Sequence, residues 1–241
     1  MRIAIFSDIH ANLPALEAFF ADVVNRKVDA MYCLGDLVGY NTWPNEVVAE
    51  IRHREIPTIA GNHDLMVKKL RRDQEAESVD YAYHLGSADA REYLATLPSF
   101  LKLQHVFDEE TMQLLMVHGS TRSVNEYMLE DLDEGYVLEM LREADTDILF
   151  CGHTHKPYHR VIPSLSSFKH VVNVGAVGKP KDGDPRGCYV ILTLHDDATL
   201  KKANGIEVEF IRFEYDVEKA ATAVENSPLP TEFADRLRKA Y

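Results

Sequence analysis

Cysteine, basic residues and long apolar runs are all scarce in this sequence of 241 residues. Its three cysteines, Cys33, Cys151 and Cys188, form an odd set beside apolar residues of predicted strands, which is typical of reduced, buried thiols. The apolar run over residues 3–6 is too short for a secretory signal, and no run approaches the ~20 residues that span a membrane. We therefore expect a cytoplasmic protein with no membrane partner.

Positive charge is also in deficit, with 26 Lys and Arg residues against 39 Asp and Glu residues and a formal net charge of −13. General attraction to a nucleic-acid backbone needs a basic face, and so does attraction to an anionic membrane surface. A nucleic-acid polymer is therefore not the expected partner, although a short oligonucleotide or a cyclic nucleotide stays open. The sequence does not predict the oligomeric state.

Internal repeats, low-complexity tracts and clear linkers are absent as well, so we expect one domain over residues 1–241. At the beginning of the chain, apolar runs alternate with helical spacing at a βαβ period, which predicts a parallel sheet with right-handed crossovers. Residues 65–97 are expected to form a helical excursion, and residues 217–240 closing helices. The predicted strands are 2–7, 30–34, 58–60, 100–107, 112–117, 148–151, 158–162, 170–174, 188–194 and 206–215, with a helix over 133–144.

Five stretches share one pattern, in which an apolar run stops sharply and is followed by side chains that bind metals. They are Ser7-Asp8-Ile9-His10, Gly35-Asp36, Gly61-Asn62-His63-Asp64, Val117-His118-Gly119 and Gly152-His153-Thr154-His155. An open α/β sheet presents its functional groups in the crevice outside the carboxyl ends of its strands. We therefore expect the five stretches to converge on two divalent metal ions, with Asp36 between them.

The types and spacing of these residues indicate the kind of site. Asp8 and His10 are two residues apart, and in an extended segment they would point to one side; the same spacing relates His153 and His155. Nitrogen and oxygen ligands without cysteine suit Mn, Fe, Zn, Co or Ni. Two carboxylates leave two divalent ions with residual positive charge, which attracts an anion such as a phosphate ester.

Taken together and in order, these stretches resemble the calcineurin-like metallophosphoesterase superfamily, whose pattern is D-x-H, G-D-x-x, G-N-H-[DE], H and G-H-x-H. The resemblance spans residues 1 to about 195 and implies an α/β (α+β) fold, a four-layer αββα sandwich of two mixed β-sheets flanked by helices. It also implies His63 as an unligated proton donor or oxyanion stabiliser, with Asp64 orienting its ring. The implied metal ligands are Asp8, His10, Asp36 and His155 for one ion, and Asp36, Asn62, His118 and His153 for the other.

The sequence departs from the superfamily's pattern at one position, and this limits the substrates that the resemblance implies. Tyr40 stands where protein Ser/Thr phosphatases of this superfamily have the phosphate-binding Arg, so phosphoproteins are not the expected substrates. The chain is more similar to the small stand-alone prokaryotic-type members, through residues 35–40, 118–122 and 173–180. Candidate substrate-binding residues are Tyr40, Asn41, Arg122 and Asn12. For Arg122 a solvated loop position is equally open, for Asn12 a helix cap is favoured, and for Lys179 and Arg186 a surface loop is favoured.

The leading hypothesis is a metal-dependent phosphoric ester hydrolase acting on a small phosphorylated substrate. In it, a hydroxide bridging two metal ions, with manganese among the candidates, attacks phosphorus in line, and His63 assists. A phosphodiester is slightly favoured over a phosphomonoester as substrate. The alternative is a non-catalytic scaffold or a phosphate-ligand sensor on the same fold.

Overall fold

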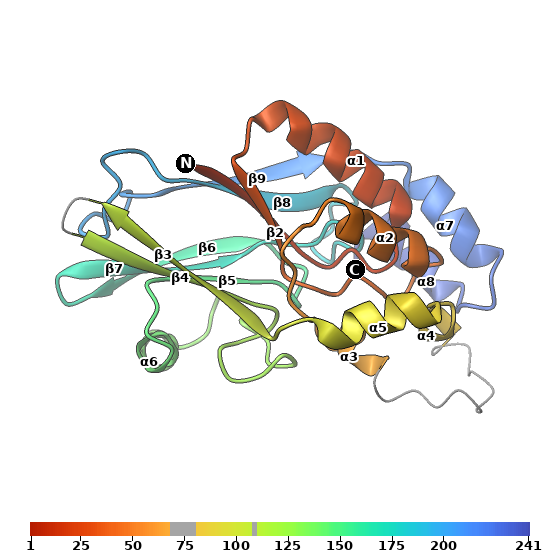
Figure 1. Ribbon diagram of the computed structural model, residues 1–241, viewed down its shortest axis with the longest axis horizontal. Coiled ribbons are helices and arrows are strands. Elements are labelled where there is room, and N and C mark those ends of the chain that lie inside the picture. Colours follow the sequence, from red (N-terminus) through yellow and green to blue (C-terminus); the bar gives the residue numbers. More distant parts are fainter. Residues whose placement is uncertain (68–80, 108–109) are drawn as a thin grey trace.

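The computed structural model describes residues 1–67, 81–107 and 110–241, whose strands form two sheets (Figure 1). One sheet has the order β2-β1-β8-β9, with β2 (Ala30–Cys33), β1 (Arg2–Phe6), β8 (Gly187–Thr193) and β9 (Glu207–Phe213). The other has the order β3-β4-β5-β7-β6, with β3 (Phe100–Phe107), β4 (Glu110–Val117), β5 (Ile148–Cys151), β7 (Ser167–Asn173) and β6 (Tyr158–Ser164).

Both sheets are mixed. β1 pairs parallel with β2 but antiparallel with β8, and β5 lies parallel between β4 and β7 while β6 and β7 form an antiparallel hairpin. The predicted strand over 58–60 is wrong, because only an isolated bridge joins Thr58 to Cys33. The amide of Ile59 still donates to the carbonyl of Cys33, but the chain leaves the sheet at the following residue, because the amide of Ala60 donates to the carbonyl of Pro98. The all-parallel expectation for the first sixty residues therefore holds only for β1 and β2.

Alternation along the strands builds the layers. Ile3 and Ile5 of β1 face inward, where they join Ile148 and Phe150 of the second sheet in one buried cluster. Successive side chains of a strand point to opposite faces, so the alternate residues Ala4 and Phe6 pack outward against the helical layer. That layer contains α1 (Leu13–Val23) and α2 (Pro44–His53).

On the outer face of the second sheet, Leu149 and Val171 pack against Val137 and Leu141 of α6 (Glu134–Glu143). Figure 1 shows α1 and α6 on opposite sides of the pair of sheets. The order helix, sheet, sheet, helix confirms the expected sandwich.

The remaining helices lie at one end of the molecule (Figure 1). They are α3 (Asn62–Met66), α4 (Tyr81–His84), α5 (Ala88–Thr96), α7 (Val217–Glu225) and α8 (Glu232–Lys239). Of the predicted excursion over 65–97, residues 68–80 lie outside the described ranges. α7 and α8 pack together with partly buried Tyr40 and Trp43 against them, and the one-domain organisation stays a prediction. Among the described residues, no helix combines the length and the apolarity that crossing a membrane would require.

Candidate metal centre

The loops that follow β1, β2 and β5 bring the predicted ligands together in an unusual backbone conformation. Five of these residues have a positive φ: Asp8 (57°), His10 (51°), Asp36 (55°), His153 (65°) and His155 (60°). A non-glycine residue in this region costs about 1 kcal/mol or more and is concentrated at functional sites. The extended geometry expected for Asp8-x-His10 and His153-x-His155 is therefore wrong, and left-handed turns place these side chains instead.

Backbone contacts hold these turns close to one another. The amide of Asp8 donates to the carbonyl of Gly35 at 3.0 Å, and the amide of His10 donates to the carbonyl of Asp36 at 2.9 Å. Gly61 touches the same turn, since an added Cβ would lie 2.6 Å from Cγ of Asp36 and closer still to its amide nitrogen. Glycine at this position lets the start of α3 approach Asp36.

Two carboxylates lie at the centre of the cluster. Oδ1 of Asp8 is 3.1 Å from Nε2 of His155 and 3.6 Å from Nε2 of His10. Oδ2 of Asp36 is 3.3 Å from Nε2 of His118 and 3.7 Å from Nε2 of His10. Candidate ligand atoms within 4.8 Å of one another form three overlapping groups: Asp8, His10 and His155; His10, Asp36 and His63; and Asp36, His118 and His153. Asp36 thus lies between the two outer groups.

Asn62 also faces this cluster from the first turn of α3. Its Oδ1 lies 3.1 Å from Nε2 of His118. The other five predicted ligands therefore lie around the two carboxylates.

Each of the four histidines in the outer groups uses one ring nitrogen to bind a backbone carbonyl. The carbonyl partners are Val38 for His10 (3.1 Å), Leu34 for His118 (2.8 Å), Asn125 for His153 (3.2 Å) and Lys179 for His155. A carbonyl only accepts, so that nitrogen carries the proton in the neutral ring and the other nitrogen is an acceptor. Histidine ligands of metals are oriented in this way.

The charges in the cluster also fit divalent cations. Burial raises the pKa of Asp8, but His155 and His10 outweigh it and hold that pKa well below its usual range. Burial likewise opposes ionisation of Asp36, whose pKa His118 and His63 nevertheless keep low. Oδ1 of Asp8 and Oδ2 of Asp36 are buried and accept no hydrogen bond among the described residues. A buried charge needs a counter-charge, so these two oxygens fit cations better than any other occupant.

Protons and metal ions would compete at His118. Burial alone would lower the pKa of His118, but the Asp36 carboxylate outweighs it and raises the pKa to about 9. Burial lowers the pKa of His10 to about 4, which leaves its imidazole neutral. Metal binding at His118 would therefore release a proton near neutral pH.

Asp64 has a different role from the one expected. Its carboxylate accepts from the backbone amides of Asp36 (2.7 Å), Leu37 (2.9 Å) and Gly61 (3.0 Å), so it holds the turn after β2 to the start of α3. The expectation that Asp64 orients the His63 ring is wrong, because both of its oxygens are engaged by backbone amides. Nδ1 of His63 instead hydrogen-bonds the hydroxyl of Tyr83.

Two of the candidate substrate-binding residues serve the backbone. Asn12 is buried; its Oδ1 accepts from the amide of Ala15 at 3.2 Å and its Nδ2 donates to the carbonyl of Gly178 at 2.8 Å. This confirms the helix cap and shows that both polar atoms of this buried side chain bind the backbone. Nδ2 of Asn41, also buried, donates to the carbonyl of His10 at 2.9 Å, which helps to fix the His10 turn.

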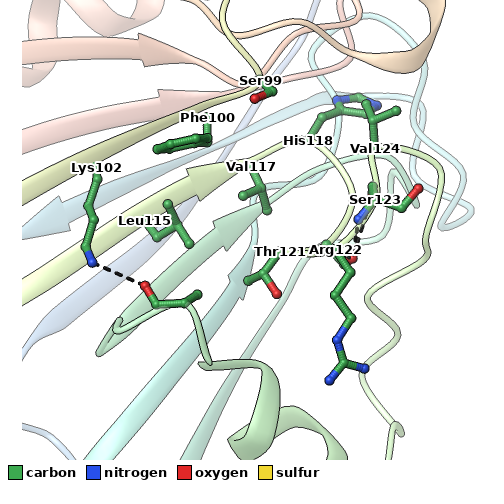
Figure 2. A pocket seen from close by; sticks show the side chains of 12 residues that line it. Ser99, Phe100, Lys102, Leu115, Val117, His118, Thr121, Arg122, Ser123 and Val124 are labelled. Atoms are coloured by element: carbon green, nitrogen blue, oxygen red, sulfur yellow. Dashed lines mark hydrogen bonds between the residues drawn. The ribbon is translucent and has the colours of Figure 1, made fainter. Parts of the chain in front are cut away.

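Arg122 and Tyr40 differ in their relation to the centre. Arg122 is exposed and binds Glu143 at 3.0 Å. It lines a cavity of about 440 Å³ beside β3 and β4, and Figure 2 shows its side chain extending away from His118. This geometry favours the solvated loop position for Arg122, one of the two alternatives that the sequence left open. The Tyr40 ring, in contrast, lies 4.9 Å from the His10 ring and 4.7 Å from the His63 ring, centroid to centroid.

Two residues near the centre, Tyr127 and Tyr83, were not predicted from the sequence, and a third, Lys179, was expected on a surface loop. The Tyr127 ring stacks on His153 at 4.4 Å, and Tyr83 contacts His63. Lys179 is only 1% exposed, so the favoured surface-loop position is wrong for it, whereas exposed Arg186 pairs with Asp184 as a surface residue would. Residues 173–180 were matched as a motif, and this was the one signal that pointed toward Lys179.

Comparison with known proteins shows the family to which the chain belongs. Residues 1–197 match the family model of the calcineurin-like phosphoesterase superfamily domain. The chain is 29% identical to an uncharacterized protein of Methanocaldococcus jannaschii, over 98% of this chain and 96% of that protein. It is 30% identical to a metallophosphoesterase of Sphaerobacter thermophilus whose crystal structure aligns with a TM-score of 0.77, over 100% and 99% of the two chains.

A hypothetical protein of Pyrococcus horikoshii OT3 shares the fold, with 21% identity and a TM-score of 0.80 over 100% of this chain and 98% of that one. The family match covers most of the sequence and includes all five ligand-bearing stretches. This chain belongs to the calcineurin-like phosphoesterase superfamily.

Proposed function

We propose that the protein is a dinuclear metal-dependent phosphoesterase that hydrolyses a small phosphorylated substrate in the cytoplasm. Asp8, His10, Asp36 and His155 would hold one divalent ion, and Asp36, Asn62, His118 and His153 the other. The observation that carries this proposal is the pair of buried carboxylate oxygens, each facing imidazole nitrogens and neither accepting a hydrogen bond among the described residues.

When bound, the two ions supply Lewis acidity, an activated water as nucleophile, and stabilisation of the attacking and leaving oxygens of an in-line displacement. The protein supplies the geometry, because backbone carbonyls fix the histidines before any substrate arrives. Such preorganisation avoids the cost of reorienting dipoles during the reaction.

His63 would act on the substrate as a hydrogen-bond donor. Burial lowers the pKa of His63 to about 4, so its ring is neutral at pH 7. We infer that the Tyr83 hydroxyl donates to Nδ1 of His63, so that the other ring nitrogen carries the proton and faces the substrate. This protonation state favours stabilisation of a developing phosphoryl charge over transfer of a proton to the leaving group.

The test is turnover with added manganese. We expect the protein to bind two ions per chain and to hydrolyse bis(p-nitrophenyl) phosphate, with p-nitrophenyl phosphate a slightly poorer substrate. Asp36→Asn removes the shared charge and should lower turnover at least ~100-fold. Asp196→Asn, on an exposed loop, is the matched control and should keep full activity. Fewer than two bound ions and no turnover of either ester would refute the proposal.

A further inference from the structure

Lys179 is a fully buried lysine without a counter-charge. It is 1% exposed, and its Nζ has no hydrogen-bond partner among the described residues. Lysine is almost never fully buried unless it is paired, because removing an ammonium from water costs several kcal/mol. The contact that is present is weak, with Nζ lying 4.5 Å from the centroid of the Tyr40 ring. Burial lowers the pKa of Lys179 to about 7, although the charges of Asp8 and Glu232 act in the opposite direction. The described residues therefore leave this amine without a hydrogen-bonded counter-charge.

The position of Lys179 connects it to the metal centre. Its backbone carbonyl accepts the hydrogen bond from Nδ1 of His155. The Tyr40 ring beneath its ammonium also contacts the rings of His10 and His63, at 4.9 and 4.7 Å. The charge thus lies one aromatic ring away from the proposed reacting centre.

A second lysine of the same loop lies close by. Lys181 is half-buried, and it forms no ion pair with any of the described residues. Lys181 follows Lys179 by two residues in the same loop. Burial lowers the pKa of Lys181, while the charges of Asp8 and Asp36 act in the opposite direction. Lys181 also lowers the pKa of Lys179, so the two cations repel each other.

Arg236 of α8 acts on the pKa of both lysines, but its guanidinium already forms an ion pair. Its guanidinium binds Glu232 one turn away at 2.5 Å. Lys156, which also acts on the pKa of Lys181, is exposed to solvent. Lys179 and Lys181 are therefore the more buried cations on this side of the centre that lack an ion pair with the described residues. In a protein of net charge −13, two adjacent uncompensated lysines are costly unless a bound anion stabilises them.

We propose that Lys179 and Lys181 form a subsite for a second phosphoryl group of the substrate. This inference rests on the proposed function, in which the metal centre holds the phosphoryl group that is cleaved. Two ammonium groups match the double negative charge of a terminal phosphoryl group, and lysine binds phosphate as a point charge. The substrate class is accordingly a compound with two phosphoryl groups, either a diphosphate or a bisphosphate.

Binding measurements test the subsite independently of turnover. The manganese-loaded protein is titrated by calorimetry with methylenediphosphonate and with methylphosphonate, and metal content is measured in the same samples. We expect the diphosphonate to bind at least ~10-fold more tightly, and this preference to fall to near twofold in Lys179→Met and in Lys181→Met. Lys219→Met, an exposed lysine on α7, is the matched control and should keep the full preference.

The outcomes separate this inference from the function on which it rests. If two ions bind and phosphodiester is hydrolysed, but both lysine variants keep the wild-type preference, the subsite is refuted while the phosphoesterase stands. A lower Tm for Lys179→Met with an unchanged preference would assign Lys179 to packing on Tyr40 and also refute the subsite. Absence of both metal binding and turnover would instead refute the phosphoesterase.

Hydrolysis assays then distinguish the two sources of a second phosphoryl group. Faster turnover of inorganic pyrophosphate identifies an anhydride, and faster turnover of fructose 1,6-bisphosphate identifies two esters. Turnover of neither above that of p-nitrophenyl phosphate would overturn the proposal.

Discussion

Gly61→Ala should abolish the metal centre, although Gly61 is not itself a proposed ligand and the substitution adds only one methyl group. The added Cβ would lie 2.6 Å from Cγ of Asp36 and closer to its Oδ1 and amide nitrogen, whereas real Cβ contacts essentially never fall below 3.0 Å. The turn after β2 must therefore shift by at least several tenths of an ångström. Metal–ligand distances tolerate only about 0.2 Å, so Asp36 could not serve both ions. The strain should also cost about 2 kcal/mol of stability.

The assay for Gly61→Ala is metal content after dialysis against buffer with a low concentration of manganese, together with urea denaturation of the metal-free protein. We expect less than one ion per chain and a lower urea midpoint. Gly86→Ala is the matched control, because the nearest atom to its added Cβ lies at 3.4 Å, an ordinary contact. Two bound ions and a stability within about 0.5 kcal/mol of the wild type in Gly61→Ala would refute the argument that this glycine sets the position of Asp36.

Three further substitutions test other parts of the structure. Asp64→Asn places an amide group against backbone donors and should cost about 2–4 kcal/mol in urea denaturation; an unchanged midpoint would show that these hydrogen bonds do not hold the turn. Arg122→Ala should leave kcat/KM within about twofold, because the guanidinium binds Glu143, and a drop of ~100-fold would restore Arg122 as a phosphate ligand. Burial lowers the pKa of His170, far from the centre on β7, to about 4; since the folded pKa lies below the unfolded one, stability is full above about pH 6.5 and falls toward pH 4. His170→Val should remove about 2 kcal/mol of the wild-type loss between pH 7 and pH 5 in metal-free protein, and parallel pH profiles would contradict this.

The predicted ligands could be found in the sequence because each follows the end of an apolar run, although the run before Asn62 forms only an isolated bridge and no strand. Their backbone conformation could not be read in the same way. Asp8 and His10 are two residues apart in an extended strand and in a left-handed turn alike, and only the hydrogen bonds to the β2 loop decide between them. The spacing of Asp8 and His10 therefore predicted correctly that the two side chains lie close together, but the extended backbone assumed for them was wrong.

Side-chain partners across long sequence separations were the second limit. Asp64 follows His63 directly, and this adjacency favoured a contact between them. In the fold, Asp64 reaches back 28 residues to the amide of Asp36, while His63 meets Tyr83. A carboxylate at the third position of a helix is drawn to free amides near the helix start, and that local preference outweighs sequence adjacency.

Lys179 combines both limits, because its backbone and its side chain act on different groups. Its carbonyl orients His155, a contact that almost any residue type could make. Its side chain is enclosed only once Tyr40 lies beneath it, with Phe233 of α8 against the other edge of that ring at 5.0 Å. A lysine in a loop rich in glycine and proline reads as solvated when α8, more than fifty residues later, is left out of account. The backbone of Lys179 thus orients the proposed metal ligand His155, and its side chain carries the amine of the proposed phosphoryl subsite. Substitution of the side chain should therefore change binding of the second phosphoryl group while the carbonyl contact to His155 stays.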